Sequence, residues 1–416
     1  MSGSRAVLMV AFVMTPGAAA ADSSNPDLIP FGERASMLGN AGITSPRGEA
    51  VYYNPANLAR LGQPQLSVSG STYLRFDLSS DALLVLQGED QPFEASGFIA
   101  IPSTVVSSYQ LGAWTLATAV LLPDVFKLKN RVTFETPAIR ITQVLDRERQ
   151  SLWFGLGGAR RITPDLSVGL SLFVANETDA ELSFIRVVQS APMTVYESFS
   201  NVDRSVLNLD AIAGAYWQAS PRVGIGARLR TIPIRLTGSG DVYQSETVTG
   251  DEDLMSEIEL EDVHVSRPAP WDVGLGLSFR PTDALELLAD LNVQLPATLR
   301  TMDDPVLGVE ETEVVAAPRA ALAADWEIAT ATWLRLGLLY NRSAVADPDT
   351  EPDGVRETYV GVTGGAAWTR GRTTTAVGAF FMRGDATFNL AGSDPPREGD
   401  AVVRLYGGLL TVSYSL

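Results

Sequence analysis

Few residues in this chain can support catalysis or metal binding. Its 416 residues include one histidine, His264, and no cysteine, which excludes disulfides, thiolate chemistry and multi-histidine metal centres. A hydrolase would have to use His264, which follows Glu261 and Asp262, and no Gly-x-Ser-x-Gly segment accompanies it. The sequence also contains no phosphate-binding loop or dinucleotide fingerprint. It therefore predicts no enzyme, no cofactor and no metal, with a hydrolase centred on His264 kept as an alternative.

The charge of the chain points away from nucleic acid as a partner. There are 31 basic and 49 acidic residues, giving a net charge of −18 without a basic patch. Nine of the acidic residues fall between Asp241 and Asp262, where there is no basic residue and no calcium-loop spacing. This stretch is predicted to be a solvated external loop.

The first residues resemble an export signal. Arg5 supplies a positive start, residues 6–14 are apolar, and Ala19, Ala20 and Ala21 offer a small-residue cleavage site. Residues 1–21 are therefore predicted to be a signal peptide, and the apolar stretch is too short to span a bilayer. The uncharged stretch 97–123 is long enough for a spanning helix, but its proline and polar residues favour two strands instead.

Alternation with a period of two is the dominant pattern in the rest of the chain. In 165–174, Leu166, Val168, Leu170, Leu172 and Val174 share one face, while serines and a glycine occupy the other. Residues 271–280 repeat this arrangement. Because successive side chains of a strand point to opposite faces, each such segment has one oily face and one small or polar face.

About fourteen segments follow this pattern, and the links between them alternate in length. Short turns, such as 163–164 and 370–372, alternate with long links near 77–95, 123–149, 177–202, 237–266, 296–317, 343–356 and 386–400. That asymmetry is typical of an outer-membrane barrel with tight periplasmic turns and long external loops. The predicted strands are 65–76, 96–108, 112–122, 150–161, 165–176, 203–218, 222–236, 267–280, 284–295, 318–328, 332–342, 357–369, 373–385 and 401–415.

The fold predicted from these segments is all-β, a 14-stranded antiparallel transmembrane β-barrel in the bacterial outer membrane. A secreted β-sandwich is the alternative, but it gives no reason for link lengths to alternate. Tryptophan and tyrosine near strand ends, including Trp114, Trp217 and Tyr414, suit the aromatic girdles of a barrel. The last strand ends at Leu416, where such barrels usually carry phenylalanine.

The segment between the signal and the first strand carries two motifs instead of alternation. A glycine-rich run contains Gly32, Arg34, Ala35, Gly39, Ala41 and Gly42, and it is followed by Tyr53, Asn54, Pro55 and Ala56. The two motifs in this order resemble the N-terminal hatch of the FadL and TodX-type family of outer-membrane transporters for long-chain fatty acids and other hydrophobic compounds. Segments 267–281 and 334–341 and the closing strand are also similar to that family, whereas 123–265 matches only in its rhythm of strands and links.

The resemblance implies a hatch over residues 22–64 that plugs a barrel formed by residues 65–416. It further implies passive uptake of fatty acids or hydrocarbons by a monomer, through loop capture, a lumenal pocket, hatch rearrangement and lateral exit beside a kinked strand. The most plausible place for that kink is strand 112–122. Lipid and lipopolysaccharide would be the other partners. A structural or secretion-accessory barrel that binds another protein is the first alternative.

Two of the long links are rich in apolar residues that could capture a hydrophobic ligand. The candidates are Phe184, Ile185, Val187, Met193, Tyr196, Phe199, Phe126 and Phe134. The other interpretation is that these residues extend the strands above the membrane and pack on one another.

Charged residues on the inward face of the predicted strands are candidates for contact with the hatch or with a ligand. They include Arg228, Arg230, Arg280, Asp290, Arg319 and Arg335. An arginine could hold a carboxylate head group in a bidentate pair. The other interpretation is a network of ion pairs that fills the plugged lumen.

Overall fold

The computed structural model describes residues 25, 27–190, 193–250, 254–304, 308–346, 355–390 and 397–416. The predicted signal peptide, residues 1–21, lies outside them. Within the described part, no helix has both the length and the apolar character needed to cross a membrane. Among the described residues, three short helical segments precede the strands: η2 (Ala35–Leu38), α2 (Ala50–Tyr53) and η3 (Pro55–Arg60).

The described strands follow one another along the rest of the chain. They are β1 (Gln65–Leu86), β2 (Glu89–Leu111), β3 (Trp114–Glu135), β4 (Ile139–Arg161), β5 (Leu166–Ser190), β6 (Met193–Ser220), β7 (Val223–Arg230), β8 (Ile234–Thr249), β9 (Leu254–His264), β10 (Asp272–Thr282), β11 (Leu285–Gln294), β12 (Ala297–Asp304), β13 (Gly308–Val314), β14 (Ala317–Ala329), β15 (Thr332–Arg342), β16 (Arg356–Arg370), β17 (Thr373–Asn389) and β18 (Glu398–Ser415).

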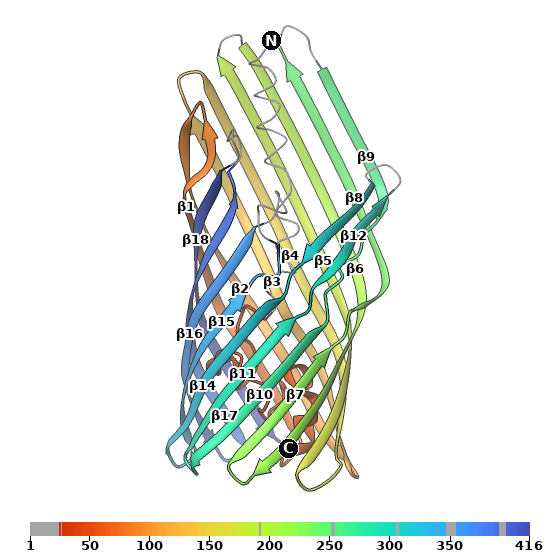
Figure 1. Ribbon diagram of the computed structural model, residues 1–416, viewed down its shortest axis with the longest axis vertical. Coiled ribbons are helices and arrows are strands. Elements are labelled where there is room, and N and C mark those ends of the chain that lie inside the picture. The colour runs from red at the N-terminus through yellow and green to blue at the C-terminus, as the bar shows by residue number, and fades with distance from the viewer. Residues whose placement is uncertain are drawn as a thin grey trace.

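These strands form a closed antiparallel barrel, as predicted (Figure 1). β1 pairs with β18, with Gln65 opposite Ser415, and the pairing of β5 with β6 completes the ring. Four strands of the wall are each divided into a lower and an upper part. These pairs are β7 with β8, β10 with β9, β11 with β12, and β14 with β13. Counted in this way, the wall has 14 strands.

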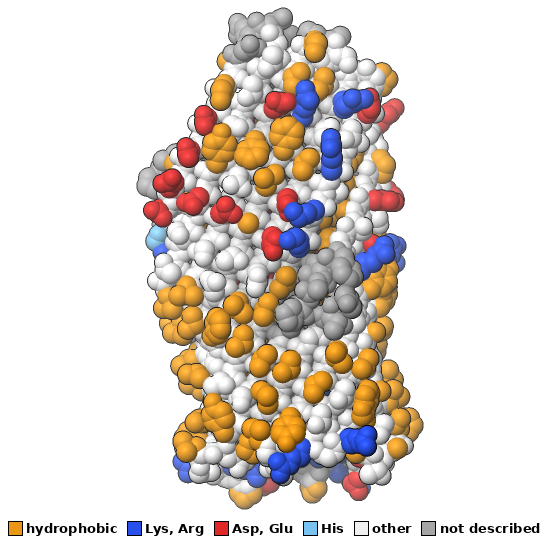
Figure 2. Space-filling view, turned by 180° about the vertical axis from the view of Figure 1, so that it is seen from behind, with side chains coloured by type: hydrophobic (Ala, Val, Ile, Leu, Met, Phe, Trp, Pro, Cys, Tyr) orange, Lys and Arg blue, Asp and Glu red, His pale blue; other side chains and the backbone are white. Residues whose placement is uncertain are grey.

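The alternation predicted from the sequence is confirmed along these strands. On β5 the side chains of Val168, Leu170 and Leu172 are exposed on the outside, whereas Ser167 and Ser171 are buried inside. Figure 2 shows the result on one face of the molecule as a broad hydrophobic band across its lower half, with charged side chains below and above the band. An apolar band on the outside of a closed barrel is the surface that a bilayer requires.

The prediction of a long loop is wrong for five segments, because the described residues of 77–95, 123–149, 177–202, 237–266 and 296–317 lie mainly in strands. The wall continues far above the hydrophobic band, and the β5–β6 and β8–β9 hairpins rise to its top (Figure 1). The turn joining β1 to β2 needs only Gln87 and Gly88, both with positive φ.

The alternation pattern did not predict the upper strands, because their outer face carries ion pairs where the strands of the band carry apolar residues. Lys127 meets Glu148, and Lys129 meets Asp146, each at 2.5 Å between β3 and β4. Cross-strand pairs of opposite charge stabilise a sheet whose outer face meets water. The alternation therefore continues in these segments, but between apolar and charged residues.

The hatch motifs lie inside the barrel, against its lower half. The contacts of η3 are with β3, β4, β5 and β6, and those of η2 are with β14, β15, β16 and β17. In the hatch, Phe31 stacks on Tyr53, and Tyr52 packs edge-on against both rings. Tyr52 also packs edge-on against Trp153 and Phe173 of the wall. The hatch thus shares an aromatic core with the wall.

The lipid-facing side of β5 provides a test of the band. Leu170→Arg places a charge in its middle and is expected to lower the free energy of unfolding by about 3 kcal/mol. Urea unfolding of the protein in lipid vesicles measures the change. The matched control is Leu182→Arg, on the outer face of the same strand above the band, for which we expect a loss below about 1 kcal/mol. Equal losses at both positions would contradict the assignment of the band.

Candidate functional site

Asn54 joins the hatch to the barrel wall. Its side-chain amide donates to the carbonyl of Ile43 at 2.8 Å and to the carbonyl of Ala215 in β6 at 3.0 Å. Its Oδ1 accepts from the amide of Ala56 at 3.1 Å and so caps η3, which begins at Pro55. A side chain with both a donor and an acceptor is needed here, and asparagine is a short one that supplies both.

The glycines of the first hatch motif allow close packing. A Cβ on Gly42 would lie 2.4 Å from the ring of Tyr53, and one on Gly39 would lie 2.7 Å from the carbonyl oxygen of Leu338 in the wall. Gly39 also has a φ of 62°, and Gly32 has a φ of 100° beside Glu49. Tyr53 completes this arrangement by donating its hydroxyl to Asn40 Oδ1 at 2.9 Å.

The inner face of the wall also carries glycine at several places where the hatch backbone touches it. A Cβ on Gly169 or Gly214 would lie 2.5 Å or less from the nearest atom of the Asn54–Ala56 segment. Gly337 similarly admits the backbone of Leu38 and Gly39. Part of the abundance of glycine therefore reflects backbone contact between the hatch and the wall.

Arg34 is the charged anchor of the first hatch motif. Its guanidinium binds Glu286 of β11 at 2.5 Å and Asp325 of β14 at 2.6 Å, and it is almost fully buried. Arg335 of β15 approaches Asp325 at 3.5 Å and donates to the carbonyl of Glu33 at 3.3 Å. Buried charges of this kind persist only when they are paired, so the contacts fix the hatch against three neighbouring strands.

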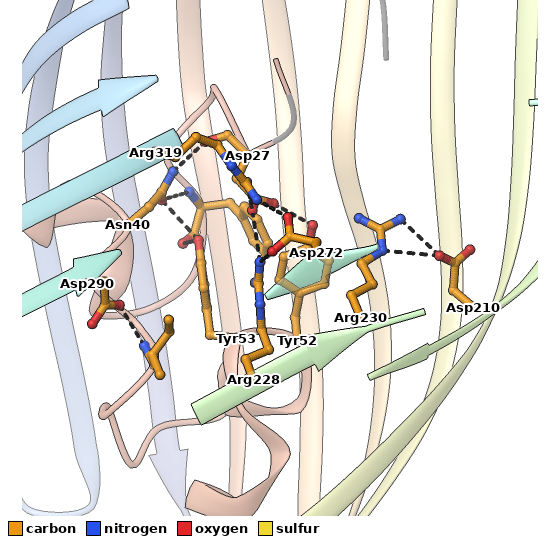
Figure 3. A network of polar contacts seen from close by, with 12 residues as sticks. Asp27, Asn40, Tyr52, Tyr53, Asp210, Arg228, Arg230, Asp272, Asp290 and Arg319 are labelled. Atoms are coloured by element: carbon orange, nitrogen blue, oxygen red, sulfur yellow. Dashed lines mark hydrogen bonds and ion pairs between the residues drawn. The ribbon is translucent and has the colours of Figure 1, made fainter. Parts of the chain in front are cut away.

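A second network holds the start of the hatch at Asp27 (Figure 3). The carboxylate of Asp27 binds Arg319 at 2.5 Å and accepts from the Tyr52 hydroxyl at 2.5 Å. Arg228 lies 3.7 Å from Asp27 and 2.9 Å from Asp272, which also pairs with Arg319. Burial alone would raise the pKa of Asp27, but Arg319 and Arg228 outweigh it and hold that pKa well below its usual range.

The remaining lumenal candidates also contact protein groups. Arg230 binds Asp210 at 2.9 Å and lies 4.5 Å from the centre of the Trp153 ring. Asp290 accepts from the amide of Ile43 at 2.8 Å, and Arg280 pairs with Glu286 at 3.2 Å on the lower rim. The structure therefore brings all six lumenal candidates into polar contact with the hatch or with neighbouring strands, and a role in ligand binding stays a prediction.

A cavity of about 370 Å³ lies above the hatch, inside the upper wall. Asp27, Leu28, Ile29 and Tyr52 of the hatch line it from one side. Apolar residues of three strands form much of its wall: Leu74, Phe76, Leu78, Val125, Phe126, Leu128, Val403 and Leu405. A cavity of this size that is mostly apolar, with polar groups in one sector, is the usual form of a small-molecule site.

The wall next to this cavity is not fully paired. β2 and β3 pair only from Leu111 opposite Trp114 to Thr104 opposite Leu121. Continued in the same register, the next positions would bring Pro102 opposite Pro123, and neither proline has an N–H to donate. Above this point β2 pairs with β1, and β3 pairs with β4. This break, called the wall opening below, lies one residue beyond the strand 112–122 in which the kink was expected.

Two phenylalanines face each other across the wall opening. The rings of Phe76 in β1 and Phe126 in β3 stack at 6.0 Å, and between these strands runs β2. A Cβ on Gly97 of β2 would lie 2.1 Å from the Phe76 ring, so only glycine leaves room for the ring there. Phe126 is the ligand-capture candidate that lines the cavity.

The other capture candidates lie higher, in strands and not in loops. Phe134, Ile185, Val187 and Tyr196 are buried together with Leu84, Leu86 and Ile141 in a cluster near the top of the wall. Met193 is exposed at the tip of the β5–β6 hairpin, Phe184 is half-buried, and half-buried Phe199 contacts Tyr243. The buried four match the interpretation in which strand extensions pack on one another.

His264 lies at the exposed end of β9. Its Nδ1 faces the guanidinium of Arg235 at 3.1 Å. The described residues of the acidic stretch 241–262, which was predicted to be a loop, lie mainly in β8 and β9. Its many exposed side chains are those of a hairpin in water.

Comparison with known proteins identifies solved structures that share this fold. The sequence matches no protein-family model and no curated protein. Among solved structures, a Pseudomonas aeruginosa FadL homologue aligns over 94% of this chain and 98% of its own, with 13% identity and a TM-score of 0.60. The P. putida toluene transporter TodX aligns over 94% and 99%, with 10% identity and a TM-score of 0.63. The chain has the fold of these proteins.

A further structure with this fold is the Ralstonia pickettii toluene transporter TbuX, with 12% identity, a TM-score of 0.57 and coverage of 94% of this chain and 99% of its own. Since the alignments span 94% of the chain, they extend into the region 123–265, where the sequence resembled the family only in its order of strands and links. This likeness agrees with the fold predicted from alternation and from the hatch motifs.

Sequence reasoning missed several residues of the site. Asp27 and Tyr52 stand outside both motifs, and no local signal distinguishes them. Arg147 and Arg149, which line the cavity, were overlooked because 123–149 was predicted to be a loop. The alternation of Arg147, Arg149 and Ser151 on one face of β4 is the signal that could have identified them.

Asp27→Asn tests the network that holds the start of the hatch. Because the folded-state pKa of Asp27 is lowered, its stabilisation is present above the usual Asp pKa of about 4 and is lost as the pH falls below it. We expect the variant to be less stable than the parent by about 3 kcal/mol at pH 7, with the difference shrinking towards pH 3. Thermal unfolding in detergent across this pH range measures it.

The control is Asp385→Asn, an exposed carboxylate paired with Arg383 on the same strand, β17. It should change stability by less than about 0.5 kcal/mol at any of these pH values. A stability difference for Asp27→Asn that does not depend on pH would contradict the ionised network.

Proposed function

We propose that this protein admits hydrophobic molecules passively across the bacterial outer membrane. The observation that carries the proposal is the largely apolar cavity inside a plugged barrel, bordered by the hatch below and by the wall opening at its side. The FadL homologue and the toluene transporters with the same fold support it. The order of parts along the chain is a signal peptide at 1–21, a hatch at 22–64 and a barrel at 65–416.

The proposed path starts at the upper wall. A hydrophobic molecule would bind first near the top, where Met193 is exposed, and would then reach the cavity lined by Phe126. Transfer between apolar surfaces keeps the molecule out of water, which favours each step by about 25 cal/mol for each Å² of apolar surface kept buried. No energy source is needed when the cell consumes the molecule inside.

The hatch closes the direct route through the barrel. Leu28 and Ile29, which line the cavity, directly follow Asp27, whose ion pairs hold this segment to the wall. A ligand that displaces Leu28 and Ile29 would therefore strain the Asp27 network. We propose that this coupling makes the hatch responsive to an occupied cavity.

The wall opening is the proposed exit into the membrane. Between Phe76 and Phe126 an apolar molecule would leave the cavity sideways, past the positions where Pro102 and Pro123 interrupt pairing. Such an exit avoids the buried ion pairs of the lower lumen. An apolar molecule would have to desolvate those charges if it passed straight through.

Uptake by cells tests the proposal directly. Cells that produce the protein should accumulate labelled toluene or oleate at least several-fold faster than cells without it, because the apolar path bypasses the polar outer leaflet. The rate should rise in proportion to the external concentration until the cavity saturates. Identical uptake of every hydrophobic compound by both kinds of cell would contradict transport.

The exit can be tested by cross-linking, since the chain has no cysteine of its own. The double variant Phe76→Cys and Phe126→Cys, joined by a short bis-thiosulfonate reagent, should reduce uptake at least fivefold, and reducing agent should restore it. The control pair, Phe381→Cys and Tyr406→Cys, replaces two aromatic rings 5.2 Å apart on the outer face of β17 and β18, where both side chains are exposed and point away from the cavity. Uptake that is insensitive to the first cross-link would exclude this exit.

A further inference from the structure

The cavity has two chemically different sides. Its apolar side consists of β1, β3 and β18 residues together with Leu28 and Ile29. Its polar side is formed mainly by β4, β5, the link between β9 and β10, and β16. A ligand must therefore be compatible with the charges of the second side, whatever its apolar part is.

Each arginine on the polar side already binds a carboxylate of the protein. Arg149 pairs with Asp124 at 2.7 Å. Arg267 pairs with Glu177 at 3.3 Å and lies 3.8 Å from Asp124. Arg147 makes two such contacts, with Asp179 at 3.0 Å and Glu181 at 3.5 Å. An incoming carboxylate would have to compete with these partners.

Glu357 of β16 adds another negative group to this side. It lines the cavity half-buried, and its Oε2 accepts from the Tyr359 hydroxyl at 3.1 Å. Within the described residues it has no arginine or lysine nitrogen within 4.0 Å. Its carboxylate is therefore an acceptor that faces the cavity without a direct ion pair in the described part of the chain, and the nearest cation whose charge acts on it, Arg149, is already bound to Asp124.

The described residues of the polar side consequently carry more negative than positive charge. The guanidiniums of Arg147, Arg149 and Arg267 stand against three carboxylates that line the cavity, those of Asp124, Glu177 and Glu357. Asp179 and Glu181, which bind Arg147 without lining the cavity, add two more negative charges behind this side. The other charges near the cavity are matched, since Arg230 pairs with Asp210 and Asp27 pairs with Arg319. Repulsion between like charges is strong where water is scarce.

We infer that the cavity selects uncharged apolar molecules, including those that end in a hydroxyl group, and rejects carboxylates. A hydroxyl group can donate to Glu357, whereas a carboxylate can only accept and adds a like charge. The inference rests on the proposed function and narrows its substrates to hydrocarbons and alcohols. The arginines of the lumen are then structural ion-pair partners, and none of them is a receptor for an acid head group.

Decanol and decanoate form a matched pair for the test, because both contain ten carbon atoms and only decanoate carries a charged head group. The full chain in lipid nanodiscs at pH 7.5 is equilibrated with each labelled compound, and binding to empty nanodiscs is subtracted. We expect decanol to bind at least about tenfold more tightly than decanoate, as repulsion from unmatched carboxylates requires. Uptake of labelled toluene by cells is measured in parallel.

Glu357→Gln examines the cause, since it removes the charge and keeps the shape. Decanoate should bind about fivefold more tightly to this variant, and decanol about two- to threefold more weakly, because the amide is a poorer acceptor. The control Glu148→Gln lies on the outer face of β4, 56% exposed, and should alter neither affinity. The opposite changes for the two ligands cannot arise from simple loss of folding.

The outcomes separate the inference from the proposed function. Equal affinities for decanol and decanoate, with normal uptake of toluene, overturn the inference and leave the transport proposal intact. An unchanged decanoate affinity in Glu357→Gln also overturns it. Failure to bind either compound, together with absent uptake of toluene, overturns the transport proposal and the inference with it.

Discussion

A peptide group in contact with lipid must find its hydrogen-bond partner within the protein, and the architecture of this chain depends on that constraint. A closed ring of antiparallel strands satisfies it, because no strand of the band has a free edge. The interruption at the wall opening is local: Pro102 and Pro123 would face each other, and pairing between β2 and β3 ends before them. The same constraint that closes the barrel therefore makes a pair of prolines sufficient to open it at one place.

Closing the ring leaves a lumen that the hatch must fill. The contacts between the hatch and the inner wall determine which residue types occur there. Glycines on the inner wall admit the hatch backbone, so that Gly169 and Gly214 face the Asn54–Ala56 segment. Arginines and carboxylates then join the hatch to the wall, as Arg34 does with Glu286 and Asp325. A buried ion that loses its partner is costly in free energy. These pairs therefore fix the hatch in one position, and their net contribution to the free energy of folding is small.

The sequence allowed the barrel, its strand number and the place of the hatch motifs to be predicted, because lipid imposes a strict alternation of side chains. Val168, Leu170 and Leu172 could be assigned to one face without any knowledge of their neighbours. The upper wall could not be predicted in this way, since outside lipid its outer face carries charges such as Lys127 and Glu148. Contacts between distant positions, such as Asp27 with Arg319, have no local pattern at all.

The height of the upper wall has a consequence for where the molecule meets its surroundings. β6 contains 28 residues, which at about 3.3 Å per residue gives a strand roughly 90 Å long, and a tilt of about 40° leaves roughly 70 Å of height. An apolar band of about 25 Å accounts for little more than a third of that. The rim on this side therefore stands tens of ångströms beyond the lipid, at the level of the carbohydrate that coats such a membrane. Under the proposed function, the mouth of the barrel would therefore receive hydrophobic molecules well above the lipid surface.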